Sequence, residues 1–167
     1  MPLLVDTHIA ADRWTQVLPD VTQTLDATCG AVLDHLAVAE SAAAFEISIL
    51  LGDDACLKSL NGAHRGKDRA TNVLSFPTYE PGEWKGHINE GYPVLLGDLA
   101  LSLDTLEREA AGKGIAAAAH LTHLTVHGVL HLLGYDHESE SAAQQMEQIE
   151  RDICARLGLS DPYGDDV

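Results

Sequence analysis

The most regular hydrophobic pattern in the chain lies at residues 45–51, where apolar and polar positions alternate. This alternation predicts a β-strand with one face on the core. Shorter apolar runs predict three more strands, at residues 3–6, 73–76 and 94–102. Gly97 interrupts the last of these, and a glycine inside a strand indicates a bulge or the close approach of another backbone. The first run is short and is expected at an edge of the sheet.

Apolar residues that recur every three or four positions predict helices at residues 20–39, 104–111 and 141–157. Gly30 lies within the first of these, which is expected to break there or to be two helices. A shorter helix is expected to begin at a cap formed by Asp53 or Asp54 and to end at residues 61–62. Arg13 and Trp14 are expected in a connector.

The longest helix is expected at residues 115–133. It is apolar on almost every side, so we expect it to be buried at the centre of the molecule. The predicted strands come early and the helices late, which indicates an α+β fold. We expect a small mixed β-sheet packed with helices around this central, histidine-bearing helix. The 167 residues are expected to form a single domain, residues 1–167.

The composition argues against a membrane protein or a secreted one. No run of about 18 uncharged apolar residues occurs, and the N-terminus lacks a basic start followed by an apolar stretch. The three cysteines are irregularly spaced, which fits reduced thiols. We therefore expect a cytoplasmic protein with no membrane partner.

The formal net charge of −16 is unusual for a protein that binds nucleic acid, since such proteins are usually basic. The positive charge is unevenly placed, however, because four of the ten Lys and Arg residues lie between Lys58 and Arg69. Phosphate contacts are local, so Arg65, Lys67 and Arg69 are candidates to bind a phosphate or a carboxylate. The alternative is an ordinary solvated loop.

Five of the nine histidines lie between His120 and His137. His127 and His131 are four residues apart, which places them on one face of a helix. Gly134 is expected to end that helix, so that His137 returns toward the other two. Three imidazoles leave one position open on a tetrahedral zinc ion, the pattern of a catalytic site. The alternative is a set of surface and capping histidines with no metal.

Other polar and aromatic residues leave alternatives open. His120 and His123 lie on or near the same helix face. Each could contact a metal ligand, contact the substrate, or be a buried histidine with a hydrogen-bond partner. His87 is a weaker candidate for a fourth metal ligand. Three aromatic residues at residues 78–93 are expected to anchor an exposed loop, and the alternative is stacking on a base: Tyr79, Trp84 and Tyr92.

The residue after the first ligand separates two classes of metal hydrolase. Zinc peptidases with an HExxH motif have a glutamate there as general base, whereas this chain has Gly128. Asp136 or Glu138 could serve as the general base instead. Alternatively, Asp136 could orient one of the histidines.

The segment HGVLHLLGYDH resembles the signature of the YbeY family, bacterial rRNA maturation factors described as metal-dependent endoribonucleases. LNGAHRGKDRATNVLSFP and LLGDLALS are similar to two further blocks of that family. The resemblance implies that His127, His131 and His137 bind one Zn²⁺ ion, with nickel as the open alternative. It also implies that Arg65 is the essential basic residue of the cleft, and that these four residues are catalytic.

The resemblance further implies a single-strand-preferring endoribonuclease that acts in 16S rRNA maturation and in ribosome quality control. The expected partners are rRNA and the small ribosomal subunit, with a ribosomal protein and an assembly GTPase as further candidates and no DNA. Two other functions remain open: a zinc metallopeptidase-like hydrolase, and a ribosome-assembly factor whose metal is mainly structural.

Overall fold

A mixed four-stranded sheet lies between the helices of the molecule. The computed structural model describes residues 3–36, 38, 43–65 and 72–164, except for the side chains of residues 63–65. The strands run in the order β1-β2-β4-β3, with β1, β2 and β4 parallel and β3 antiparallel. The strand bounds are β1 (Leu3–Ile9), β2 (Phe45–Gly52), β3 (Val73–Pro77) and β4 (Val94–Ser102). The mixed sheet and the edge position of β1 are confirmed.

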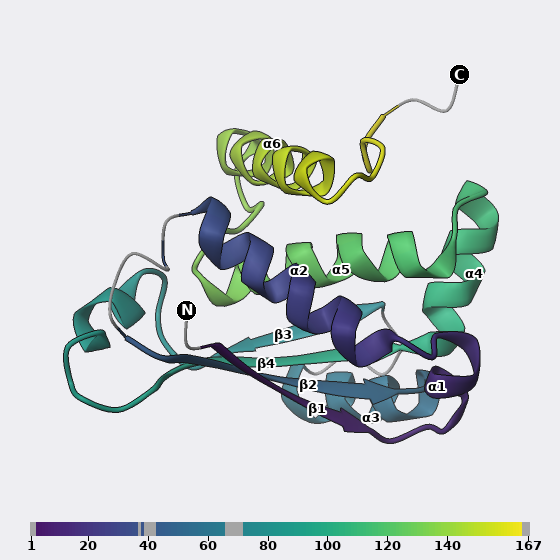
Figure 1. Ribbon diagram of the computed structural model, residues 1–167, viewed down its shortest axis with the longest axis horizontal. Coiled ribbons are helices and arrows are strands. Elements are labelled where there is room, and N and C mark those ends of the chain that lie inside the picture. The colour runs from purple at the N-terminus through teal and green to yellow at the C-terminus, as the bar shows by residue number, and fades with distance from the viewer. Residues whose placement is uncertain (1–2, 37, 39–42, 66–71, 165–167) are drawn as a thin grey trace.

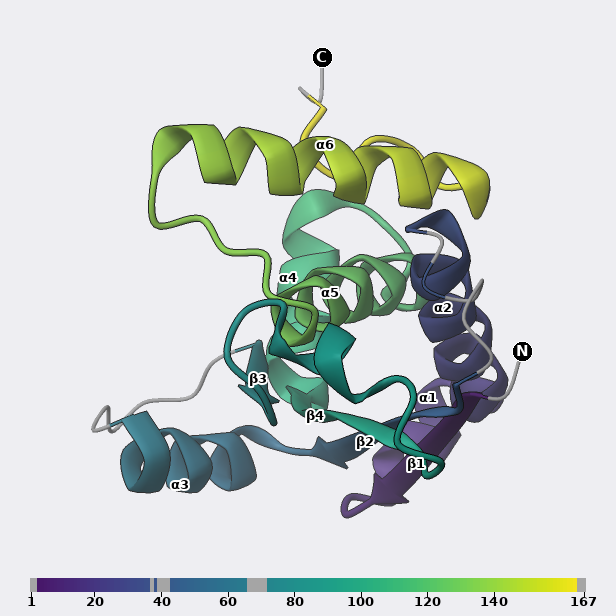
Figure 2. The same cartoon turned by 90° about the vertical axis from the view of Figure 1, so that its left-hand side faces the viewer.

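The helices lie in layers on the two faces of this sheet (Figures 1 and 2). α3 lies on one face, α2 and α5 lie on the other, and α6 crosses the outer side of α5. The α+β fold class is therefore confirmed. The helix bounds are α1 (Arg13–Val17), α2 (Val21–His35), α3 (Asp54–Arg65), the 3-10 helix η2 (Glu83–His87), α4 (Leu103–Lys113), α5 (Ala117–Leu132) and α6 (Glu140–Arg156).

α5 is the central helix that its apolar sequence predicts. It packs against β3 and β4 on one side and against α2, α4 and α6 on the others. Leu121, Val129 and Leu130 lie on different faces of it, and all three are fully buried. Because neighbours surround α5, it can hold histidines at fixed positions inside the protein.

Two glycines allow α5 to lie close to the sheet. Gly97 has a φ of +144°, and a Cβ there would lie 2.4 Å from the Phe76 carbonyl oxygen. The pairing of β2 with β4 shifts by one residue at the same point, so the predicted irregularity is confirmed. At Gly128, a Cβ would lie 2.9 Å from Leu99 Cδ2, so α5 contacts β4 through its backbone at that position.

Four expectations about the elements were wrong in detail. α2 continues through Gly30, because α2 packs on β1, α5 and α6 along its length and this tertiary contact outweighs the low helix propensity of one glycine. α3 continues past residues 61–62 to Arg65. Arg13 and Trp14 begin the short helix α1, where the buried Trp14 indole donates a hydrogen bond to the Gly52 carbonyl. The segment at residues 78–93 contains η2.

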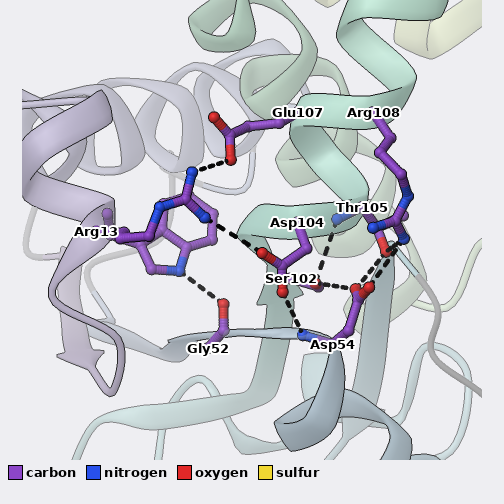
Figure 3. A network of polar contacts seen from close by, with 9 residues as sticks. Arg13, Gly52, Asp54, Ser102, Asp104, Thr105, Glu107 and Arg108 are labelled. Carbon is purple, nitrogen blue, oxygen red and sulfur yellow. Dashed lines mark hydrogen bonds and ion pairs between the residues drawn. The ribbon is translucent and has the colours of Figure 1, made fainter.

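A network of polar contacts joins the start of α3 to the start of α4 (Figure 3). The Asp54 carboxylate accepts hydrogen bonds from Ser102, Thr105 and Arg108. Asp104 accepts one from the Asp54 backbone N–H at 3.0 Å and contacts Arg13 on α1. The network fixes the first turn of α3, the helix that ends at Arg65.

Within the described parts of the chain, none of the helices has the length and apolar character needed to cross a membrane. The three cysteines, Cys29, Cys56 and Cys154, are free.

Candidate metal centre

The C-terminal end of α5 and the turn that follows it form the candidate metal centre. Gly134 has a φ of +105°, and a Cβ there would lie 3.0 Å from Pro81 Cα, so the turn requires glycine. The backbone N–H groups of Gly134 and Tyr135 bond to the carbonyls of His131 and Leu130, which satisfies the end of the helix. The chain then reverses direction and returns to the last turn of α5.

This reversal brings His127, His131 and His137 together, as the sequence predicts. One ring nitrogen from each of the three lies within 4.8 Å of the others. The Nε2 atoms of His127 and His131 are 3.1 Å apart. Two nitrogens bound to a tetrahedral zinc ion at 2.0–2.1 Å would be about 3.3 Å apart. The three imidazoles therefore fit a single ion of this size.

The protonation state of His131 and the exposure of the cluster also suit a catalytic ion. Burial, together with His127 and His137, lowers the pKa of His131 to about 4, so the ring is neutral at neutral pH. Neutral imidazole is the form that binds metal. His127 and His131 are partly buried while His137 is exposed, so the cluster opens to solvent on one side.

Glu150 on α6 is a buried carboxylate next to the cluster. Its Oε2 atom lies 3.2 Å from His127 Nδ1, and its Oε1 atom lies 2.8 Å from His123 Nε2. The Tyr163 hydroxyl donates to Oε1 at 2.8 Å. Burial alone would raise the pKa of Glu150, but the hydrogen bonds from His123, His127 and Tyr163 outweigh it and lower the pKa to about 2. Glu150 is therefore ionised.

Sequence analysis missed Glu150, although a signal was present. The apolar face of α6 includes Met146 and Ile153, and Glu150 lies four residues after the first and three before the second. A charged residue inside an apolar helix face needs a buried partner. That partner is on α5, and sequence spacing does not show which helix will pack there.

The other two histidines of α5 are buried, and each contacts a carboxylate. His123 contacts Glu150, so it belongs to the group around His127. His120 is 1% exposed and instead contacts Glu109 on α4, with Nε2 and Oε1 2.8 Å apart. His120 is therefore directed away from the cluster.

The candidate phosphate-binding residues are described only in part. The backbone of Arg65 forms the last residue of α3, and its side chain lies outside the described residues. Lys67 and Arg69 also lie outside them.

The aromatic residues of the 78–93 segment mostly anchor it. Trp84 is buried and donates a hydrogen bond to the Leu133 carbonyl at 3.1 Å, which confirms the anchoring role for this residue. The ring of Tyr79 stacks on His87, whose Nδ1 contacts Glu90. Among the described residues, the group able to hold a metal does not include His87. Tyr92 is 66% exposed.

Two acidic residues after α5 were candidates for a base. Asp136 accepts a hydrogen bond from the Glu138 backbone N–H at 3.2 Å, which shapes the turn. Both residues are described, and the carboxylate found in contact with a histidine of the cluster is Glu150.

Comparisons with known proteins agree with the histidine signature. The family model described as "Endoribonuclease YbeY" matches residues 9–158. A protein of that description from Bradyrhizobium diazoefficiens is 43% identical over 164 residues, which is 97% of this chain and 86% of its own length. Another from Paramagnetospirillum magneticum is 42% identical over 169 residues, which is 98% of this chain and 99% of its own.

A solved structure shows the same fold at low sequence identity. The solution structure of TM1509 from Thermotoga maritima matches with a TM-score of 0.53 and 20% identity, over 97% of this chain and 100% of that one.

Proposed function

The chain belongs to the YbeY endoribonuclease family, and on that premise we propose that it is a metal-dependent endoribonuclease that prefers single-stranded RNA. One zinc ion is held by His127, His131 and His137, and Arg65 contacts the phosphate of the bond to be cleaved. The substrate is ribosomal RNA. The protein acts in the cytoplasm, in maturation of 16S rRNA on the small subunit and in ribosome quality control.

The observation that carries this proposal is the convergence of three imidazole nitrogens within 4.8 Å on the solvent-facing end of α5. Three protein ligands leave room for a substrate oxygen or a water. When bound, an ion of this kind supplies Lewis-acid chemistry at a phosphoryl oxygen or activates water. Nickel is the alternative ion, since imidazole ligands suit both metals.

Arg65 supports the choice of a phosphodiester as substrate. A guanidinium forms two parallel hydrogen bonds with a phosphate and offsets the charge that develops during cleavage. The polar network around Asp54 fixes the start of α3, and Arg65 is the last residue of that helix.

A pocket beside the metal centre supports the preference for single strands. It has a volume of about 340 Å³, and its lining includes Trp84, Lys85, Leu133, Tyr135 and Gln145. Tyr135 belongs to the turn that carries His137. A base that has left its stack can enter such a pocket, whereas a paired base in a duplex cannot.

The packing of Gly128 supports a nuclease over a peptidase of the HExxH type. A side chain at this position would meet Leu99 and the Ser75 hydroxyl of the sheet, because the Cβ would lie 2.9 Å and 3.4 Å from them. Position 128 therefore faces the sheet and has no room for a glutamate that acts as general base.

The test is digestion of single-stranded RNA and of casein by metal-free and zinc-loaded protein. Cleavage of RNA that a chelator abolishes and zinc restores is expected, with casein left intact. His131→Ala is expected to lose both zinc and cleavage. Arg65→Ala is expected to keep zinc and lose cleavage, and the exposed His8→Ala serves as a matched histidine control with wild-type behaviour.

Each other outcome contradicts the proposal in a defined way. Cleavage by highly purified His131→Ala would assign the nuclease activity to a contaminant. Cleavage of casein alone would favour the peptidase. Zinc-loaded protein that cleaves nothing, together with metal-free protein that stays folded and still binds the small subunit, would favour the assembly factor.

A further inference from the structure

Glu150 lies at the contact between α6 and α5, and it is 0% exposed. We propose that Glu150 is a positioning residue for the metal centre: it holds His127 in the tautomer that leaves Nε2 free for the ion, and Tyr163 holds Glu150 in place. This inference rests on the proposed metal site and adds residues that touch neither metal nor substrate.

The hydrogen bond between Glu150 and His127 has a defined direction. The Tyr163 hydroxyl and ring nitrogens of His123 and His127 all lie within hydrogen-bond distance of the Glu150 carboxylate. A carboxylate oxygen accepts hydrogen bonds, so His127 Nδ1 is the donor in the 3.2 Å contact with Glu150 and carries a ring proton. In the neutral ring, Nε2 carries the lone pair, and this is the atom that lies 3.1 Å from His131 Nε2 within the cluster.

The Glu150 carboxylate is itself fixed in orientation. Glu150 Oε1 accepts from both His123 and Tyr163, each at 2.8 Å, while Oε2 accepts from His127. With donors on both oxygens, rotation of the carboxylate would break at least one hydrogen bond in a buried site. The ring plane of His127 is set by a group that cannot turn freely.

The segment after α6 holds Tyr163 in place. The ring of Tyr163 lies edge-on to His123 at 5.3 Å, and the Arg151 guanidinium lies 5.4 Å from the centre of the Tyr163 ring. Arg151 also bonds to Asp161 of the same segment. These contacts hold Tyr163 against Glu150, so the segment after α6 helps to fix the carboxylate.

A residue with a purely structural role would show the same burial, so the test needs a measurement that such a role does not change. The protonated nitrogen of His127 in metal-free protein is read from ¹⁵N-resolved imidazole spectra. Zinc affinity is measured by competition with a chelating dye. The stability of each metal-free variant is measured by urea unfolding.

The variants are Glu150→Gln, Glu150→Asp and Tyr163→Phe, with Asp152→Asn as a charge-matched control. Asp152 is exposed on the same helix, and its described contact is with Gln148. Glu150→Gln is expected to weaken zinc binding about 10–100-fold and to reduce the Nδ1–H form of His127. Glu150→Asp keeps the charge and is expected to restore part of the loss. Tyr163→Phe is expected to lose less zinc affinity than Glu150→Gln. Asp152→Asn is expected to bind zinc as tightly as wild type.

The imidazole spectrum of metal-free wild type reports the tautomer of His127, so it tests the inference even if a variant fails to fold. Metal-free wild type with the His127 proton on Nε2 would overturn it. So would folded Glu150→Gln that binds zinc as tightly as wild type. If wild type itself binds no zinc, the proposed function fails instead, and the tautomer of His127 still decides whether Glu150 positions the ring.

Discussion

At the scale of single residues, the three candidate ligands differ in their surroundings. His127 is held by Glu150, and His131 has a hydrogen bond with the backbone of Tyr135. His137 is exposed on the turn after α5. The fold therefore depends little on His137, while a metal ion would need it as a ligand.

This difference predicts that His137→Ala separates stability from metal binding. Removing an exposed side chain is expected to change the free energy of unfolding of the metal-free protein by less than about 0.5 kcal/mol. The same change removes one of three ligands and is expected to abolish stoichiometric zinc. Urea unfolding and metal analysis measure the two effects, and a variant that retains one equivalent of zinc would show that His137 is not a ligand.

The residues that carry the site differ in how far the sequence predicts them. His127, His131 and His137 follow from local geometry, namely the repeat of a helix and a glycine at its end. Glu150 reaches His127 only because α6 packs on α5, and no local spacing encodes that contact. Arg65 was identified by resemblance, and its side chain lies outside the described residues.

At the scale of elements, the contact between α5 and the sheet depends on Gly97. A Cβ at this position would lie within 3.0 Å of Phe76, Pro77 and Leu132, and the φ of +144° is strained for any other residue.

Gly97→Ala is therefore expected to lower the free energy of unfolding by about 3 kcal/mol or more. Gly30→Ala is the matched comparison, because nothing lies within 4 Å of a Cβ there and the residue is inside α2. It is expected to stabilise the protein by about 0.5–1 kcal/mol. Urea unfolding of both variants checks the pair, and equal stabilities would contradict the close contact at Gly97.

The network at the start of α3 predicts a pH-dependent part of the stability. Burial alone would raise the pKa of Asp54, but hydrogen bonds from Ser102, Thr105 and Arg108 lower it below its usual value of 3.8. A folded-state pKa below the unfolded one stabilises the protein above about pH 4, and this contribution is lost as the pH falls below that value.

Asp54→Asn is expected to cost about 1 kcal/mol at pH 7, because the Asp54 side chain is partly exposed. The difference from wild type is expected to shrink as the pH falls below 4. Urea unfolding from pH 7 to pH 3 measures it, and a difference that stays constant over this range would show that the Asp54 charge contributes nothing.

The sequence predicts the type of most elements better than their ends. The strand at residues 45–51 and the helix at residues 115–133 have strong patterns, and both occur within two residues of the expected bounds. α3 runs beyond Asn61 and Gly62 despite the weak helix propensity of these residues, and Asn61 is buried within it. α1 exists because the buried Trp14 indole finds a partner at the Gly52 carbonyl, on a strand far away in sequence.

At the scale of the whole molecule, the charge of −16 must be compatible with binding of RNA. Many of the described cations already have acidic partners: Arg13 with Asp104 and Glu107, Arg108 with Asp54, and Arg151 with Asp161. RNA is therefore expected to be held by a few local contacts near the metal centre rather than by a wide basic face.

This view predicts a shallow dependence of RNA affinity on salt. Each phosphate contact on a single strand contributes about 0.7 to the slope of log K against log salt concentration, so Arg65→Ala is expected to reduce the slope by about that amount. Lys113→Ala, at the distant end of α4, is the control and is expected to leave it unchanged. Fluorescence anisotropy with a short labelled RNA measures the slopes, and equal effects of the two variants would rule out a specific role for Arg65.

The measurement that tests the three-histidine centre most directly is a titration of zinc into metal-free protein during RNA cleavage. The rate is expected to rise in proportion to added zinc and to level off at one equivalent, with no rise for His131→Ala at any zinc concentration tested. A rate that is independent of zinc, or a His131→Ala variant that follows the wild-type curve, would contradict catalysis by an ion held at His127, His131 and His137.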